Sequence, residues 1–314
     1  MPDPRPIHSR PFSLRRWMLD RLCLRPTRHP LDHAPQEKFW IERQPMRFAC
    51  FRQQQIPQLL TGNPSRVPVD RSLELLIIKF PGTAGRAELS PPHPANAWPD
   101  KRIEVWSINP PGYGESPGRA SLDHIPAMSL AMLDEARRQY PGVPLLVYGN
   151  SIGSLAAMQT VAFATQQQYA PVIGLLLRNP LDLFPLIMEH RRRWYHGPVP
   201  KWLTSDQRKN RERYNAANES FANLDSTDLV KACSCPLLMV QAEFDTIVPP
   251  TNQDRVFAAH PGPKIKFVIP QADHHQTPTP DNENLYGQYL ATIRAAFSST
   301  FAMESTIALN ESSR

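Results

Sequence analysis

The sequence predicts an α/β fold: a mostly parallel central sheet flanked by helices, with an N-terminal β-hairpin and a small helical lid insertion. Six short apolar runs recur along the chain, and stretches of helical character separate most of them. Because helices cover both faces of a parallel sheet, its buried strands read as continuous apolar runs. The six runs, which we interpret as strands, are residues 73–80, 103–108, 144–148, 172–177, 236–240 and 265–269.

The other elements can be placed around these strands. A hairpin is expected first, over residues 38–53, because apolar and polar side chains alternate on both sides of a central Gln-Pro pair. Residues 122–140 place apolar side chains at helical spacing and end at a Pro-Gly pair. A further helix begins at Ser151, and another over residues 281–301 opens with an acidic, N-cap-like turn.

These elements divide the chain into three parts. A basic, Pro-rich arm (1–37) precedes the folded domain (38–301), and a tail (302–314) follows it. Within the domain, residues 181–231 do not fit a simple strand–helix repeat and mix aromatic, aliphatic and polar side chains. We expect this insertion to form a lid over the functional site, because ligands in open α/β sheets bind beyond the carboxyl ends of the strands.

The composition excludes several classes of protein. The chain has 314 residues, of which 41% are apolar, and this is too many for a disordered chain. No apolar run approaches the ~18 residues of a membrane span. The net charge of +6 is concentrated in residues 1–60, which carry 11 basic and 5 acidic side chains, whereas the remainder is balanced at 24 of each. We therefore expect no nucleic-acid partner, since phosphate binding needs a basic stripe on the folded surface.

The cysteines and the N-terminus predict a cytoplasmic protein. Four cysteines cannot form a useful disulfide framework in a chain of this length, and the Cys-x-Cys pair has no second cluster nearby to complete a metal site. Asp20 and Arg21 interrupt the first apolar stretch before it reaches the ~7 to 15 residues of a signal sequence. The sequence contains no indication of an oligomeric state. The four cysteines are Cys23, Cys50, Cys233 and Cys235.

Apolar side chains in the arm are spaced as if they face one side of a basic amphipathic helix. Such a helix would allow weak contact with a membrane surface. Docking onto the protein's own surface explains the same spacing equally well, so the sequence leaves both interpretations open. The side chains concerned are Phe12, Leu14, Trp17, Met18, Leu22 and Leu24.

The strongest signal for chemistry is the pentapeptide Gly149-Asn150-Ser151-Ile152-Gly153. An apolar run leads straight into it and small residues follow, which is the strand–turn–helix context of a nucleophile elbow. In such an elbow the serine takes a strained backbone conformation at the tip of a tight turn, and the flanking glycines leave room where larger side chains would collide. We therefore interpret Ser151 as a nucleophile.

With this elbow in place, two loops resemble those of the α/β-hydrolase family. Residues 80–85 (FPGTAG) resemble its His-Gly-x-x-Gly oxyanion loop, with Pro81 where histidine is commoner. Residues 109–116 (NPPGYGES) match its D-x-P-G-Y-G-x-S turn, with Asn109 in place of aspartate. The resemblance covers about residues 38–300 and implies an α/β-hydrolase fold for nearly the whole chain beyond the arm.

The resemblance also implies an acid and a base, which follow the nucleophile in that order along the chain. Asp245 lies in a run similar to the family's G-x-x-D-x-x-V-P and fits the register better than Glu243, the competing carboxylate. The base is expected after the next strand, at His274, the fourth position of a turn that resembles G-x-x-H. The adjacent His275 is the alternative, because Gln271 replaces the usual small residue.

The activity implied is that of a serine hydrolase acting on an acyl bond of a small-molecule substrate, with a carboxylic ester favoured. Ser151 would attack, with His274 as base and Asp245 as its orienting acid, and backbone N–H groups of Ile152 and of Thr83 or Gly82 would hold the oxyanion. Such a reaction requires no metal or organic cofactor. The sequence does not separate hydrolysis from acyl transfer or thioester cleavage on the same residues, and a non-catalytic interaction protein is the rival from another class.

Overall fold

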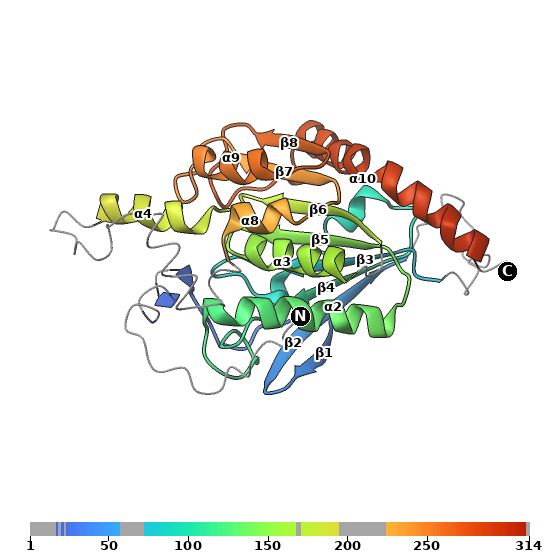
Figure 1. Cartoon of the computed structure of the whole chain (residues 1–314), viewed down its shortest axis with the longest axis horizontal. Helices are drawn as coiled ribbons and strands as arrows, with labels where there is room; N and C mark the ends of the chain where they lie inside the picture. The colour runs from blue at the N-terminus through green and yellow to red at the C-terminus, as the bar shows by residue number, and fades with distance from the viewer. Residues whose placement is uncertain are drawn as a thin grey trace.

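The described residues of the computed structural model form an eight-stranded sheet with the order β1-β2-β4-β3-β5-β6-β7-β8 (Figure 1). β1 and β2 form an antiparallel hairpin and β2 pairs antiparallel with β4, whereas all other neighbours are parallel. The strands are β1 Glu37–Arg43, β2 Met46–Gln55, β3 Leu75–Phe80, β4 Ile103–Ile108, β5 Leu145–Asn150, β6 Val172–Arg178, β7 Leu237–Ala242 and β8 Lys264–Ile269. The structure describes residues 17, 20, 21, 23–56, 72–167, 171–194 and 224–311.

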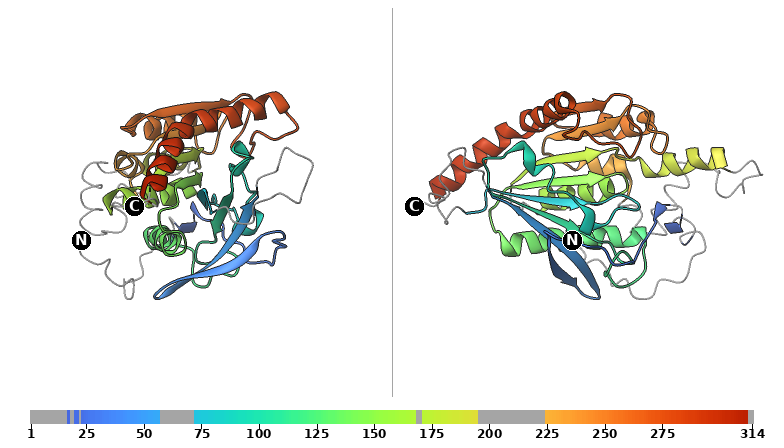
Figure 2. Two further views of the ribbon diagram at one scale, coloured as in Figure 1. Left: turned by 90° about the vertical axis from the view of Figure 1, so that its right-hand side faces the viewer. Right: turned by 180° about the vertical axis from the view of Figure 1, so that it is seen from behind.

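This arrangement confirms the predicted hairpin and mostly parallel sheet. β3, β4 and β7 are buried along their whole lengths, because helices cover both faces. The helices α2 and α3 lie on one face, and α10 crosses the other (Figure 2). The helices are η2 Ala87–Leu89, η3 Ala95–Ala97, η4 Leu122–His124, α2 Ile125–Gln139, α3 Gly153–Gln166, α4 Leu183–Trp194, α8 Ser226–Lys231, α9 Pro250–Ala259 and α10 Glu283–Glu311.

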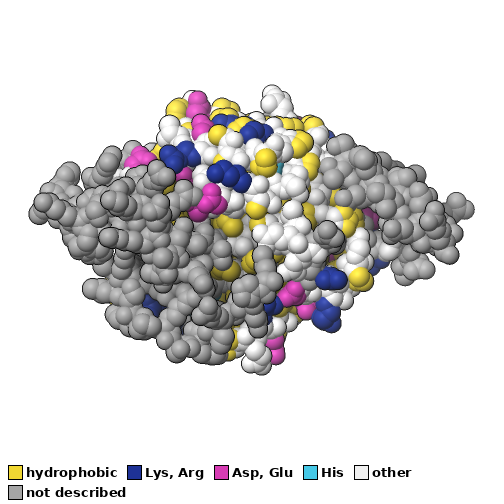
Figure 3. Space-filling model, viewed as in Figure 1, with side chains coloured by type: hydrophobic (Ala, Val, Ile, Leu, Met, Phe, Trp, Pro, Cys, Tyr) yellow, Lys and Arg dark blue, Asp and Glu magenta, His cyan; other side chains and the backbone are white. Residues whose placement is uncertain are grey.

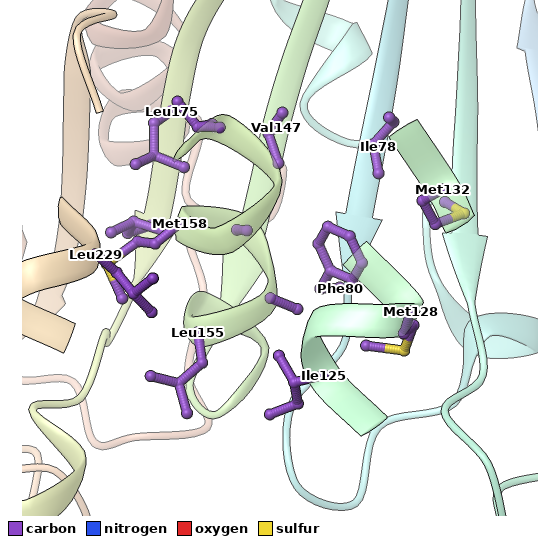
Figure 4. Close-up of a cluster of buried hydrophobic side chains, with 14 of the residues drawn as sticks. Ile78, Phe80, Ile125, Met128, Met132, Val147, Leu155, Met158, Leu175 and Leu229 are labelled. Atoms are coloured by element: carbon purple, nitrogen blue, oxygen red, sulfur yellow. The ribbon is translucent and has the colours of Figure 1, made fainter. Parts of the chain in front are cut away.

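Two hydrophobic clusters hold the helices to the sheet. On the α2 and α3 side, Phe80 at the end of β3 is fully buried in the same cluster as Met128 and Leu155 (Figure 4). On the other side, Phe297 of α10 is buried against β6, where a Cβ on Gly174 would come within 2.2 Å of its ring. Burying an aromatic side chain stabilises the fold by about 1.5–3 kcal/mol. These contacts fix the sheet relative to the helices on both of its faces.

Two predicted helices differ in detail from those observed. The stretch 122–140 begins as the short helix η4 and becomes α-helical only from Ile125, where Pro126 occupies the first turn and lacks the N–H that a helix interior requires. The helix expected to end at residue 301 instead continues to Glu311, so most of the expected tail at 302–314 is helical. Residues 302–311 contain no glycine or proline to end it.

The insertion at 181–231 is described only at its two ends. α4 begins it and ends at Trp194, and α8 closes it at Lys231. The side chain of Asp225 caps α8 by accepting hydrogen bonds from the N–H groups of Thr227 and Asp228. The lid expected between these helices lies outside the described residues.

The described residues of the arm contact the folded domain. The Asp20 carboxylate is buried and accepts hydrogen bonds from the Leu122 N–H (3.0 Å) and the Ser121 hydroxyl (3.2 Å). Leu24 packs against the main hydrophobic cluster, as the docking interpretation expects. Four of the other side chains expected on its apolar face lie outside the described residues: Phe12, Leu14, Met18 and Leu22.

The described surface carries charges of both signs, and the cysteines form no disulfide. On the face in Figure 3, charged side chains of both signs are interspersed with apolar and uncharged ones over the described residues. No helix in the described ranges is long and apolar enough to cross a bilayer. All four cysteines are free, and burial raises the pKa of the Cys23 and Cys235 thiols to about 12. These two thiols are therefore held in the neutral form at pH 7.

Candidate active site

Ser151 lies in a strained turn between β5 and α3. Its φ of 51° is in the left-handed region, which non-glycine residues rarely adopt. A Cβ on Gly149 would lie 2.6 Å from the Ser154 Cα, and one on Gly153 would lie 2.2 Å from the Phe80 carbonyl oxygen. Both glycines are thus required, one for the turn from strand to helix and the other for the close approach of the helix to the loop after β3. This is the geometry that the pentapeptide predicts.

The structure brings the three side chains expected to react into one hydrogen-bonded chain. His274 Nε2 is 3.1 Å from Ser151 Oγ, and His274 Nδ1 is 2.7 Å from Asp245 Oδ2. The three residues follow β5, β7 and β8, and they meet because the carboxyl ends of parallel strands share one edge of the sheet. The serine and the histidine are 5% and 9% exposed, so both are shielded yet within reach of solvent.

The carboxylate of Asp245 is surrounded by donors. Its Oδ1 accepts hydrogen bonds from the N–H groups of Ile247 (3.0 Å) and Val248 (2.7 Å), and its Oδ2 accepts one from Gln253 Nε2 (3.0 Å). A carboxylate can only accept, so the bond to His274 Nδ1 requires that this nitrogen carry the proton. His274 Nε2 is then left as an acceptor for the Ser151 hydroxyl, which is the tautomer that a general base needs.

The competing histidine and carboxylate lie elsewhere. The ring of His275 meets that of His274 edge-on at a centroid distance of 5.4 Å, and the side chain is exposed. Glu243 is also exposed, and its Oε2 accepts a hydrogen bond from the Gln271 N–H at 2.8 Å. Neither side chain joins the chain of hydrogen bonds to Ser151.

The loop expected to hold the oxyanion lies against the elbow. A Cβ on Gly82 would lie 3.1 Å from Asn150 Nδ2 and 3.4 Å from the Ser151 Cβ, so the loop runs in close contact with the elbow at this glycine. The hydrogen bonds among the described residues do not use the backbone N–H groups of Ile152 or Thr83. Two N–H groups without a protein acceptor beside a serine nucleophile are what an oxyanion hole requires.

The sequence analysis missed Arg178, which ends β6 beside the elbow. Its carbonyl accepts the Ser151 N–H at 2.8 Å. Its buried guanidinium donates to the carbonyl oxygens of His274 and Gln276, each at 2.9 Å, and to Asn150 Oδ1 at 3.1 Å. One residue therefore ties the loop of the base to the turn of the nucleophile. A charged residue directly after an apolar run was the available signal.

Asn179, the next residue, was missed as well. It is fully buried and has a φ of 44°, a conformation that asparagine tolerates better than most residues. Its Nδ2 donates to the His274 carbonyl at 3.0 Å, and its Oδ1 accepts the Ala242 N–H at 2.9 Å. The side chain thus links the end of β7 to the loop that carries the base.

Two basic side chains, the buried Lys79 of β3 and the half-buried His93, lie on the face of the sheet that α10 covers. Lys79 Nζ donates to the carbonyl oxygens of Pro91 (2.6 Å) and His93 (2.7 Å), and burial lowers its pKa to about 7. His93 bonds Tyr289 Oη at 2.8 Å, and burial, with the nearby charges of Lys79 and Arg178, lowers its pKa to about 3. Both groups fasten the segment after the oxyanion loop. In the described ranges no three His, Cys, Asp or Glu side chains are grouped to hold a metal ion.

Comparison with solved structures identifies the fold. The Pyrococcus furiosus esterase Pf2001 superposes with a TM-score of 0.57 at 15% identity, covering 88% of this chain and 98% of that one. Acetyl xylan esterase 1 from Thermoanaerobacterium superposes with a TM-score of 0.53 at 16% identity, covering 85% and 86%. The chain has the α/β-hydrolase fold, which confirms the resemblance seen in its motifs.

The relatives found by sequence align with a smaller part of this chain than the solved structures do. No protein-family model matches the chain. The uncharacterized protein YfhR of Salmonella typhi is 21% identical over 216 residues, 67% of this chain and 68% of that protein. The lysophosphatidylserine lipase ABHD12 of Xenopus tropicalis is 26% identical over 145 residues, which is 46% of this chain and 36% of the lipase.

Proposed function

We propose that the protein is a serine hydrolase that cleaves an acyl bond, with carboxylic esters as its substrates, through an acyl-enzyme on Ser151. The observation that carries the proposal is the hydrogen-bonded chain from Ser151 Oγ through His274 to Asp245. The same constellation of nucleophile, base and orienting acid performs acyl transfer on unrelated folds. Esterases among the structural neighbours are in keeping with it.

The proposed mechanism follows from the protonation states that the hydrogen bonds impose. Ser151 Oγ attacks the acyl carbonyl while His274 Nε2 takes its proton, and the Asp245 carboxylate stabilises the imidazolium. The negative charge that develops on the carbonyl oxygen is held by the N–H groups of Ile152 and Thr83, with Gly82 as the alternative donor. The imidazolium then protonates the leaving alcohol, and water releases the acid by the same steps in reverse.

Apolar side chains beside the acid support an apolar portion of the substrate. Phe244 directly precedes Asp245 and Ile247 follows it by two residues, and their side chains are 52% and 40% exposed. Both belong to the loop that follows β7, on the edge of the sheet that carries Ser151. We propose that they contact the acyl or alcohol portion of the ester.

The proposal is tested with a panel of p-nitrophenyl esters of increasing acyl length, assayed on wild type and on Ser151→Ala. We expect hydrolysis by wild type and a rate indistinguishable from background in the variant. A thioester panel and an added alcohol acceptor distinguish thioester cleavage and acyl transfer on the same serine. If wild type is inert toward every acyl donor, the result would instead support the alternative hypothesis, that the protein is a non-catalytic interaction protein.

A further inference from the structure

The arm contacts the oxyanion loop directly. The backbone N–H of Arg25 donates to the carbonyl oxygen of Thr83 and to the hydroxyl of Tyr113, each at 3.1 Å. The Tyr113 hydroxyl itself donates to the same Thr83 carbonyl at 2.7 Å. Thr83 is thus held from one side by the arm and from the other by the turn after β4.

A second set of contacts joins the same three segments around a buried ion pair. Arg86 and Glu88 pair at 2.5 Å with side chains 3% and 4% exposed. Arg86 Nη1 donates to the Thr27 carbonyl at 3.0 Å, and that carbonyl also accepts the Gly114 N–H at 2.8 Å. Glu88 accepts from Asn109 Nδ2 at 2.8 Å. The ion pair is therefore satisfied partly by the arm, and removing the arm would leave a buried guanidinium short of acceptors.

Few hydrogen bonds within the loop hold its backbone in place. Between Phe80 and Arg86 it contains two glycines, and its internal hydrogen bond is Gly85 N–H to the Gly82 carbonyl at 2.9 Å. Thr83 is only half-buried. An oxyanion donor must be fixed before the reaction, because its contribution depends on not having to reorganise as charge develops. The contacts from outside the loop supply this fixation.

We propose that Tyr113 and the arm around Arg25 are positioning elements for the oxyanion donor Thr83, so that the N-terminal arm is a functional part of the active site. This inference rests on the proposed function, because it assigns a rate effect to the hydrolysis step. The Tyr113 hydroxyl and the Arg25 N–H hold the Thr83 carbonyl, and thereby restrict the backbone rotation of Thr83 on which the direction of its own N–H depends. Neither group touches the reacting atoms.

Two single substitutions test the two contacts separately. Tyr113→Phe removes the hydroxyl and keeps the ring, and Arg25→Pro removes the N–H. Arg25→Ala is the matched partner, since it loses the side chain and keeps the N–H. Tyr140→Phe is the control for loss of a tyrosine hydroxyl. Tyr140 Oη donates to Glu104 at 3.0 Å near the amino end of β4, whereas Ser151 follows the carboxyl end of β5, at the opposite edge of the sheet.

We expect Tyr113→Phe to lower kcat on a p-nitrophenyl ester by about tenfold to hundredfold with KM within about twofold, because oxyanion contacts act in the transition state. Arg25→Pro should lower kcat at least about fivefold more than Arg25→Ala. Affinity for a trifluoromethyl ketone, whose hemiketal oxyanion occupies the same hole, should fall in parallel with kcat, whereas Tyr140→Phe should match wild type in both.

The proposal is overturned if Tyr113→Phe and Arg25→Pro keep wild-type kcat and ketone affinity, even if their melting temperatures fall, because the contacts would then be structural only. A rise in KM without any loss of kcat would overturn it too. An inert wild type would instead remove the proposed function, and the positioning role with it. The two failures are distinguished by the wild-type rate.

Discussion

At the scale of single residues, the choice between two adjacent histidines decides the mechanism. Only His274 lies between Ser151 and Asp245, at 3.1 Å and 2.7 Å, while His275 is exposed. We expect His274→Ala to lower kcat by about 10⁴ to 10⁶-fold and His275→Ala by about tenfold or less. Assaying both variants on one ester is the test. An inactive His275→Ala beside a working His274→Ala would contradict the assignment, and two active variants would exclude the loop from the reaction.

Arg178 is expected to affect the rate through the position of the base. Arg178→Met removes the guanidinium donors to the carbonyl oxygens of His274 and Gln276, and the His274 carbonyl then keeps only its bond from Asn179 Nδ2. We expect a lower free energy of unfolding, by about 1–3 kcal/mol, and a fall in kcat larger than the change in KM. The downfield NMR signal of the His274 Nδ1 proton should weaken or vanish. Arg138→Met is the control, because Arg138 pairs with Glu135 on the surface and is 69% exposed.

An unchanged His274 proton signal and kcat in Arg178→Met would show that the guanidinium is not needed to position the base.

The sequence did not reveal Arg178 for a physical reason. A charged residue after a strand is ordinarily solvated, and the carbonyl groups that accept its hydrogen bonds carry no side-chain signature. By contrast, Ser151 could be located from sequence, because the glycines on either side of it form a recognisable motif between an apolar run and a run of small residues.

At the scale of elements, the packing of α3 against the loop after β3 links two motifs that are distant in sequence. A Cβ on Gly153 would lie 2.2 Å and 2.5 Å from the carbonyl oxygens of Phe80 and Pro81. We expect Gly153→Ala to displace the oxyanion loop, to destabilise the fold by about 1–3 kcal/mol and to reduce kcat strongly. Gly287→Ala is the control, because nothing lies within 4 Å of its added methyl. Thermal unfolding and ester hydrolysis measure both effects, and equal behaviour of the two variants would contradict the packing argument.

The elements themselves were largely predictable, and the exceptions have identifiable causes. Runs such as those at Leu75–Phe80 and Ile103–Ile108 mark strands because both faces are buried and most of the side chains are apolar. The docking of the arm was left open because it depends on backbone groups, including the Thr27 carbonyl and the Arg25 N–H, which any sequence possesses. The length of α10 was underestimated because its extension has no breaker residue to mark an end.

At the scale of the whole molecule, the half-buried imidazole of His93 makes the stability of the fold depend on pH. Loss of solvent around the ring, with the nearby charges of Lys79 and Arg178, lowers its pKa from the ordinary 6.5 to about 3. Between these values the unfolded chain binds a proton that the folded chain does not, so acidification favours unfolding. Lys79, Arg178, Tyr148 and Tyr289 are the charged or titratable groups around it.

We expect the free energy of unfolding of wild type to fall as pH drops from 6.5 towards 3, with His93 contributing up to about 1.4 kcal/mol per pH unit. The His93→Gln variant should show a shallower dependence. Urea unfolding at several pH values measures the slopes, and His29→Gln, which alters an exposed imidazole, is the control. Equal slopes for His93→Gln and wild type would show that the protonation of His93 is not coupled to folding.

The central claim is that Ser151 is the one activated serine of the protein, and covalent labelling tests it most directly. The protein is treated with a fluorophosphonate, and the modified peptide is identified by mass spectrometry. We expect one label per chain, on the peptide that contains Ser151, and no label on Ser151→Ala. A wild-type protein that does not react, a label on another residue, or equal labelling of the variant would contradict the claim.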